Sequence, residues 1–499
     1  MLLQPNKTKP FGLSKSKVSA YEQCPKRLWL MTHKPELAAC DDQAQARFAE
    51  GHAIGEIACE LCPGGVMIEA LPDLRAALAA TKDLIEKGHP GPIFEATFEH
   101  DGVLVRVDIL ERTPDGRWAM REVKSSTGVK DYHRGDLSTQ IWVLEQAGVE
   151  LAAASIRHVD REFVLHSVGD YAGLFRDREL LNELQELAAG RGKLVAEIRG
   201  MLAGEEPVID VGDHCGSPFP CEFSGYCHVA DEDAPDWPVS LLPYGAGKRW
   251  EKEGISDLLA LDGADLGSRD ARIVAATRSG KPFHDLNSAR QTMDQWEYPR
   301  AWLDFETIGF AVPRWIGTRP YQQIPFQFSL HLEQADGSIT HHEFLSIDGE
   351  DPRKGCAKAL VELISCGATP VAYNASFERR VLRELAATVP EFSKRLNTIA
   401  DGLVDLLPVA RDCWYHRDQR GSWSIKAVLP TIANLDYGRL DVQDGSQAQK
   451  AYLEAIDPAT EPDRRSAIDL GLRAYCRQDT LAMVIIARQF LGRDITNLL

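Results

Sequence analysis

Alternating hydrophobic and polar positions mark several short stretches in the first half of the chain. Two of them, PIFEATFEHDGVLVRVDILERTP (residues 92–114) and GRWAMREVKSS (116–126), predict three neighbouring strands. Turns are expected at residues 100–102 and 114–116, because Asp and Gly suit tight turns. Helical spacing is found in LSKSKVSAYEQCPKRLWLMTH (13–33), AQARFAEGHAIGEIACEL (44–61) and DLSTQIWVLEQAGV (136–149), and ASIRHVDREFVL (154–165) predicts further strands.

A second set of strands and helices begins near residue 298. RAWLDFETIGF (300–310) predicts a strand, PFQFSLHLEQADGSITHHEFL (325–345) a hairpin, TPVAYNASFERRVLRELAA (369–387) a strand leading into a helix, and AYCRQDTLAMVIIARQFL (474–491) a helix. The Pro- and Asp-rich stretch at 229–247 is typical of a domain boundary, and residues 246–295 are expected to be small and helical. We therefore expect an α/β multidomain protein with domains at 11–229 and 297–499, joined by a linker and small helical region at 230–296.

Composition narrows the class of protein. The chain has 499 residues, 44% hydrophobic and 26% charged, which is typical of soluble globular proteins with more than one domain. We expect a cytoplasmic protein without a membrane partner, because no apolar run could span a bilayer and the first residues lack a secretory signal. Eleven cysteines then indicate thiols or metal ligands rather than disulfides. The net charge of −18 argues against nucleic acid, although a site built from carboxylates and cations is itself acidic.

Two carboxylates and a lysine are expected on adjacent strands of the first domain. Glu122 and Lys124 are two residues apart and share one face of a strand, and Asp108 lies across a hairpin from them. Two carboxylates can hold Mg²⁺ or Mn²⁺, and a lysine beside them can orient the attacking water. The alternative is an exposed hairpin with ordinary charges.

Residues 94–149, which contain these three side chains, resemble the RecB-like branch of the PD-(D/E)XK nucleases. The resemblance implies a restriction-endonuclease-like fold in which Asp108, Glu122 and Lys124 are catalytic. It also implies a substrate contact from Gln140, although Leu144 stands where the family often has Tyr. A further metal-site group is implied on an early helix, and the candidates are His52 and Glu56.

Three cysteines recur in CGSPFPCEFSGYC (215–227), with a spacing looser than that of common zinc ribbons. In the RecB-like nucleases that resemble Cas4 and the nuclease domain of AddB, one cysteine before the core and three after it hold a [4Fe–4S] cluster. The resemblance implies that Cys24, Cys215, Cys221 and Cys227 do so here, while four thiolates would also suit Zn²⁺. Cys59 and Cys62 are expected to be buried or incidental thiols, and the remaining cysteines to be buried as small hydrophobic residues.

A second set of carboxylates lies in the C-terminal domain. Asp304 and Glu306 alternate on a strand, Glu378 begins a helix, and Tyr475 and Asp479 are one helical turn apart. This series resembles the DEDD exonucleases of the RNase H-like fold, in the variant that ends in Tyr-x3-Asp. The resemblance implies that the four acids bind two divalent cations and that the tyrosine hydroxyl orients the water.

One departure and several substrate contacts follow from the same resemblance. The third acid is usually Asp, so Glu378 would shift the geometry, and Asp405 is the alternative. Phosphates and the bound strand would be contacted by Asn374, Arg379, Arg380, Ser422 and Lys426. The aromatic residues Trp302 and Phe305 are expected in the core rather than as stacking platforms.

The chain as a whole resembles the DUF2779 proteins, in which a RecB-like nuclease is fused to an RNase H-like exonuclease. The resemblance implies a metal-dependent nuclease with two active centres that acts on DNA, trims 3′ ends, and serves repair, recombination or phage defence. The alternatives are an RNA-trimming nuclease, or a nucleic-acid-binding or scaffold protein in which one or both sites are inactive. No phosphate-binding loop motif is present, so a helicase would be a separate partner.

Overall fold

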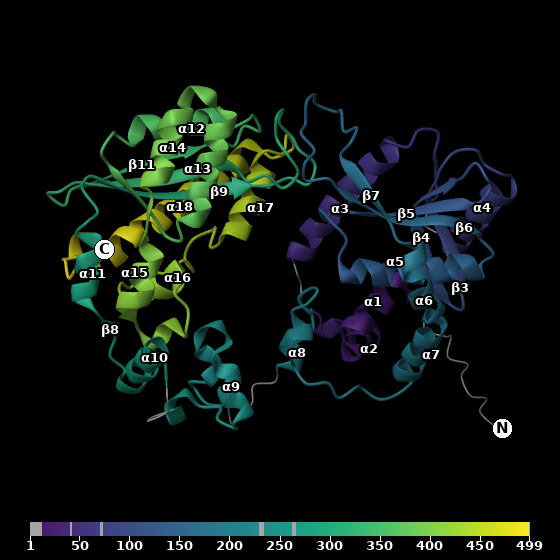
Figure 1. Cartoon of the computed structure of the whole chain (residues 1–499), viewed down its shortest axis with the longest axis horizontal. Helices are drawn as coiled ribbons and strands as arrows, with labels where there is room; N and C mark the ends of the chain where they lie inside the picture. Colours follow the sequence, from purple (N-terminus) through teal and green to yellow (C-terminus); the bar gives the residue numbers. More distant parts are fainter. Residues whose placement is uncertain (1–11, 40–41, 70–72, 229–233, 262–265, 499) are drawn as a thin grey trace. The chain divides into compact units, whose positions relative to one another are not determined.

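The chain folds into two compact units of mixed α/β structure (Figure 1). The computed structural model describes residues 12–39, 42–69, 73–228, 234–261 and 266–498. Unit 1 comprises Met1–Asp231 and Phe310–Tyr321, and unit 2 comprises Glu232–Gly309 and Gln322–Leu499. The segment expected as a linker and small helical region therefore groups almost entirely with unit 2, while a short piece of the C-terminal half groups with unit 1.

A seven-stranded sheet forms the centre of unit 1. Its strands follow the order β2-β3-β4-β5-β6-β7, and β1 pairs with β4. Their bounds are β1 Leu13–Ser14, β2 Val66–Met67, β3 Ile93–His100, β4 Val103–Arg112, β5 Trp118–Lys124, β6 Leu151–Val159 and β7 Phe175–Glu179. The three strands predicted from residues 92–126 are thus confirmed, and positive φ angles at Asp101 and Gly102 close the first turn.

Helices cover this sheet and complete its hydrophobic core. Their bounds are α1 Lys15–Gln23, α2 Pro25–His33, α3 Asp42–Glu60, α4 Leu74–Glu86, α5 Asp131–Gln146, α6 Leu181–Ala189, α7 Arg191–Leu202 and α8 Ser224–Cys227. The helical spacing of residues 13–33 corresponds to two helices, because Cys24 is extended and separates α1 from α2. The physical reason is Pro25, whose ring disfavours helical backbone in the residue before it.

Unit 2 is built around a five-stranded sheet in the order β11-β10-β9-β12-β13. Strands β9, β10 and β11 are antiparallel, whereas β12 and β13 run parallel to β9. A separate pair joins β8 to β14. The bounds are β8 Phe283–His284, β9 Arg300–Ile308, β10 Ile324–Glu333, β11 Ile339–Leu345, β12 Thr369–Ala372, β13 Val404–Asp405 and β14 Trp414–Tyr415, which confirms the strand, the hairpin and the strand-to-helix step predicted from the sequence.

The helices of unit 2 include a long C-terminal one that packs on the sheet. Their bounds are α9 Gly247–Lys252, α10 Ser268–Ser279, α11 Leu286–Met293, α12 Arg353–Leu363, α13 Ser376–Thr388, α14 Ser393–Gly402, α15 Leu406–Cys413, α16 Ile425–Val428, α17 Gly445–Ala455 and α18 Pro462–Phe490. Helix α18 contacts β9 and β10 and is mostly buried along its C-terminal half. In the described part of the chain, no helix combines the length and apolar character needed to span a membrane.

Candidate metal centres in the two units

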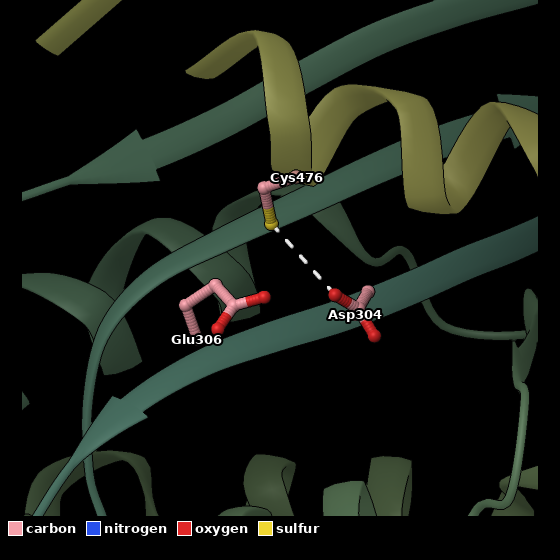
Figure 2. Close-up of side chains that lie close together, drawn as sticks. All are labelled: Asp304, Glu306 and Cys476. Carbon is pink, nitrogen blue, oxygen red and sulfur yellow. Dashed lines mark hydrogen bonds between the residues drawn. The ribbon is translucent and has the colours of Figure 1, made fainter. Parts of the chain in front are cut away.

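Four carboxylates meet beside strand β9 in unit 2. Asp304 and Glu306 alternate on β9, Glu378 lies in the first turn of α13, and Asp479 lies on the buried face of α18. Because α18 packs on β9, its acid reaches the same place as the two strand acids. Figure 2 shows Asp304 and Glu306 on the strand with Cys476 of α18 beside them.

The carboxylates of this cluster repel one another in a buried setting. Burial, and then Asp479, Glu306 and Glu378, raise the pKa of Asp304 well above its usual range. Burial and the charge of Asp479 raise the pKa of Glu306 to about 8. Burial raises the pKa of Asp479 to about 6. Hydrogen bonds from two tyrosines limit this rise. A shared cation would offset this repulsion.

Glu378 is a buried member of the cluster with one carboxylate oxygen left unsatisfied by the described residues. It is 4% exposed, and its Oε2 atom has no hydrogen-bond partner among the described residues. Burial and the nearby charge of Asp405 raise its pKa to about 8. Its charge also raises the pKa values of Asp304 and Glu306. A buried acid without a donor is the kind of group that a bound cation satisfies.

A chain of donors leads into the cluster from the side of α16. Lys426 Nζ donates to the Tyr475 hydroxyl at 3.3 Å and to the Gln443 carbonyl at 2.6 Å. Tyr475 in turn hydrogen-bonds to Asp479, and the Tyr437 hydroxyl donates to Asp479 Oδ1 at 2.6 Å. Burial and the neighbouring acids raise the pKa values of both tyrosines, which therefore keep their protons. The sequence pointed to Lys426 and Tyr475, whereas Tyr437 follows no motif and was missed.

Other residues expected at this site have local structural partners. Arg379 donates hydrogen bonds to the backbone carbonyls of Ala400 and Leu403, at the end of α14. Its guanidinium therefore has a structural role at this helix end. Asn374 has a positive φ and is exposed, and its Oδ1 accepts a hydrogen bond from the Ser376 hydroxyl.

The alternative third acid has a capping role. Asp405 Oδ1 accepts hydrogen bonds from the backbone N–H groups of Asn374 and Leu407, and thereby caps α15.

Arg380 lies over the ring of Phe377 and Ser422 is exposed. Trp302 and Phe305 are buried, as expected for core residues.

In unit 1 the expected acids lie on adjacent strands. The register of β4 and β5 pairs Ile109 with Arg121, which places Asp108 and Glu122 one step further along. At that step the backbone N–H of Val123 donates to Asp108 Oδ2 at 2.6 Å. Burial and the charge of Glu122 raise the pKa of Asp108 to about 7. The structure therefore brings Asp108 and Glu122 together.

Both carboxylate oxygens of Glu122 accept hydrogen bonds from neighbouring side chains. Its Oε1 atom accepts from Lys15 Nζ at 2.5 Å and from Lys124 Nζ at 2.9 Å, and its Oε2 atom accepts from Gln140 Nε2 at 2.6 Å. Burial opposes ionisation, but the two lysines outweigh it and hold the pKa of Glu122 well below its usual range. Lys124 also forms an ion pair with Asp136 at 3.0 Å. Gln140 thus contacts the acid directly.

Two residues near Asp108 were missed, and two candidates lie elsewhere. Lys15 is the N-terminal residue of α1, and Glu95 has a left-handed backbone on β3 and a charge that raises the pKa of Asp108. Neither position belongs to a recognisable motif. His52 and Glu56 on α3 are both exposed, and no interaction among the described residues joins them to Asp108 or Glu122. Leu144 is fully buried in the core.

The four expected cysteines line one small cavity of unit 1. Cys24, Cys215, Cys221 and Cys227 share it with charged neighbours that include Lys26 and Arg27. The backbone N–H of Cys221 donates to the carbonyl of Cys215 at 2.8 Å, which closes the loop between them. Burial raises the pKa of Cys227, and the charges of Cys215 and Cys24 raise it further. Residues far apart in the sequence thus present four thiols to one space.

The spread of these thiols bears on the group they would hold. Ligands of one tetrahedral Zn²⁺ lie about 4 Å apart, given Zn–S bonds of about 2.3 Å. Among the described residues, no three of the four sulfur atoms lie within 4.8 Å of one another. A cluster of several irons holds its thiolates further apart than a single ion does, and both groups are bound by four thiolates.

A larger groove of about 1900 Å³ runs past the Glu122 site in unit 1. Lys124, Asp136 and Tyr132 line it, together with Phe219 and Cys221 of the cysteine-rich loop. The rings of Tyr132 and Phe219 are 4.9 Å apart. The groove therefore joins the acidic site to the cysteine loop.

Comparison with known proteins gives a family match in the C-terminal half of the chain. Residues 301–424 match the family described as "Domain of unknown function (DUF2779)". That segment holds Asp304, Glu306 and Glu378, whereas Lys426, Tyr475 and Asp479 lie beyond it. The chain is 29% identical over 231 residues to "Uncharacterized protein MG366 homolog" of Mycoplasma pneumoniae, with 42% of this chain and 35% of the relative covered.

Two further similarities were found. "Uncharacterized protein MG366" of Mycoplasma genitalium is 25% identical over 236 residues, which cover 43% of this chain and 35% of the relative. The chain thus spans about a third of the length of both curated relatives. A solved structure, "Crystal structure of SSO0001", is 15% identical with a TM-score of 0.25 and covers 44% of this chain and 88% of its own.

Proposed function

We propose that this protein is a metal-dependent nuclease whose principal hydrolytic centre is the acid cluster of unit 2. The observation that carries the proposal is the convergence of Asp304, Glu306, Glu378 and Asp479 from three elements, with an unsatisfied buried carboxylate among them. The mixed sheet, with acids on its central strand and a helix bearing Tyr-x3-Asp packed on it, agrees with the RNase H-like fold that the sequence resembles.

The four acids would hold two divalent cations, Mg²⁺ or Mn²⁺, which when bound activate water and stabilise the leaving 3′ oxygen of a phosphodiester. The residues of the chain supply the rest. Tyr475, which keeps its proton and lies between Lys426 and Asp479, is positioned to orient the water. Lys426 brings a positive charge that lowers the pKa values of Glu306 and Asp479 and that a phosphate would meet.

Unit 1 would be a second, RecB-like centre with an iron–sulfur group. Asp108 and Glu122 would hold a cation there, with Lys124 beside them, and the groove would bring the strand past the site. The four cysteines would hold the [4Fe–4S] cluster, with zinc as the alternative, and would tie the N-terminal helices to the loop at 215–227. A cytoplasmic role in DNA repair, recombination or phage defence, with a separate helicase as partner, agrees with such an enzyme.

One observation favours a different role for unit 1. Lys15 lies 2.5 Å from Glu122, where it neutralises the carboxylate that a cation would need. Together with Lys124 and Gln140 it satisfies Glu122 without any metal. The second candidate function is therefore a unit 1 that binds nucleic acid without cleaving it, beside an active unit 2.

Cleavage assays on the full chain test both functions. End-labelled single- and double-stranded DNA and RNA are incubated with the protein in Mg²⁺, Mn²⁺ or EDTA, and products are resolved by size. We expect metal-dependent stepwise trimming that Asp304→Asn abolishes. Loss of a remaining activity in Lys124→Ala would assign cleavage to unit 1, whereas unchanged activity would support the binding role. Absence of cleavage in every metal would contradict the proposal.

A further inference from the structure

Cys476 lies inside the acid cluster of unit 2, and no sequence pattern marked it as a ligand. It follows Tyr475 on α18 and is fully buried. Its Sγ atom lies 3.8 Å from Asp304 Oδ2, and one donor atom each of Asp304, Glu306 and Cys476 lie within 4.8 Å of one another (Figure 2). Ligands of one ion are at most about 4.5 Å apart, twice a typical metal–ligand bond, so these three groups lie close to that range.

The surroundings of this thiol differ from those of an ordinary buried cysteine. Buried cysteines usually pack as small hydrophobic residues, as Cys356 does in the cluster that includes Ala357 and Leu360. Cys476 instead faces carboxylates, and burial followed by the charges of Asp304 and Glu306 raises the pKa of its thiol well above the usual range. In the metal-free protein the thiol donates a hydrogen bond to Asp304 Oδ2, so Cys476 is a polar neighbour of the acids and not only a packing residue.

A second feature of the same place points to a bound cation. Glu378, 4% exposed, has an Oε2 atom without a hydrogen-bond partner among the described residues, and its charge acts on Asp304 and Glu306. The cluster therefore contains a carboxylate oxygen that no donor among the described residues satisfies, beside a thiol that could ligate a metal ion. A cation that accepts both atom types is the group that would satisfy it.

We propose that Cys476 is a thiolate ligand of the cation held by Asp304 and Glu306, and that its sulfur gives the centre a preference for Zn²⁺ and Co²⁺ over Mg²⁺. This inference rests on the metal centre proposed above. On binding, a metal–sulfur bond forms, the S–H proton passes to solvent, and no electron is transferred. Oxygen-only sites suit Mg²⁺, whereas a thiolate selects softer cations.

Cobalt titration of the full chain tests the proposal with a readout that does not depend on activity. Thiolate bound to Co²⁺ gives a charge-transfer band in the near ultraviolet, and Mg²⁺ affinity is obtained by competition. We expect Cys476→Ser to lose part of this band and to weaken Co²⁺ binding by about tenfold or more, with little change for Mg²⁺. Cys413→Ser, a buried cysteine of the same unit, is the matched control and should behave as wild type.

The outcomes separate this inference from the proposed nuclease function. Equal cobalt bands and affinities in wild type and Cys476→Ser would overturn the ligand role, even if both proteins cleave nucleic acid. A band that depends on Cys476 would support it, even if no metal supports cleavage. If the variant does not fold, as judged by circular dichroism, Cys476→Ala is titrated in its place, and a cobalt band equal to that of wild type would overturn the proposal.

Discussion

Neutralising Glu378 tests whether the acid cluster of unit 2 opposes folding when no cation is bound. Glu378 is buried with an unpartnered Oε2 atom among the described residues, and burial, followed by Asp405, raises its pKa from 4.5 to about 8. Each pH unit of that difference corresponds to about 1.4 kcal/mol, so ionised Glu378 lowers the stability of the folded state by at most about 5 kcal/mol. Glu378→Gln removes the charge and keeps the shape.

The sign of the pH dependence follows from which state holds the proton more tightly. The folded state retains the Glu378 proton up to about pH 8, so the metal-free wild type loses stability as the pH rises from about 4.5 to about 8. Glu378→Gln lacks this loss. We expect urea denaturation in EDTA to show the stability difference, variant minus wild type, widening by about 3 kcal/mol between about pH 5.5 and about pH 8.5.

The control and the refuting result use the same titration. Glu362→Gln neutralises an exposed acid on α12 and should leave the difference from wild type constant with pH. Excess Mn²⁺ should stabilise wild type more than Glu378→Gln, because the variant has lost a ligand. If the difference between Glu378→Gln and wild type stays flat with pH, the carboxylate is not the uncompensated charge that the structure indicates.

Further predictions concern ion pairs and the cysteine cavity. Arg488→Met should destabilise unit 2 by about 3–5 kcal/mol in chemical denaturation, because it leaves buried Glu333 without the guanidinium at 2.9 Å; a loss of less than about 1 kcal/mol would contradict this. Lys15→Met should cost unit 1 only about 1–3 kcal/mol in the same measurement, because Lys15 is 23% exposed and a second lysine remains. Cys24→Ser should remove the absorbance at about 400 nm of anaerobically purified protein, and Cys356→Ser should keep it; retained colour in Cys24→Ser would exclude that cysteine as a ligand.

The strands and their acids could be predicted because their signals are local. Alternation of two residues along β5 and β9 places Glu122 with Lys124, and Asp304 with Glu306, on one face each. The short turn between β3 and β4 and the next between β4 and β5 set the register that brings Asp108 beside Glu122. These relations depend on neighbours in the sequence.

The remaining site residues depend on tertiary packing, which no local pattern encodes. Lys15 reaches Glu122 only because α1 packs near the sheet, and Tyr437 reaches Asp479 from an irregular segment. His52 and Glu56 were expected near the metal from the resemblance to the RecB-like nucleases, yet both are exposed. Helical spacing specifies which residues share a face, and the packing of the helix decides which face meets the site.

The two centres hold their carboxylates in opposite electrostatic states, and this sets how each would respond to metal. In unit 1, Lys15 and Lys124 hold the pKa of Glu122 low, so a cation must displace an existing ion pair and the net gain on binding is small. In unit 2, burial and mutual repulsion raise the pKa values of Glu306 and Glu378 to about 8. A bound cation would therefore reduce the repulsion between these buried carboxylates, which destabilises the metal-free folded state. For equal numbers of carboxylate ligands, the centre in unit 2 should therefore fill at the lower metal concentration. Activity that depends on unit 1 would then require either more metal or a substrate phosphate that draws Lys15 away from Glu122.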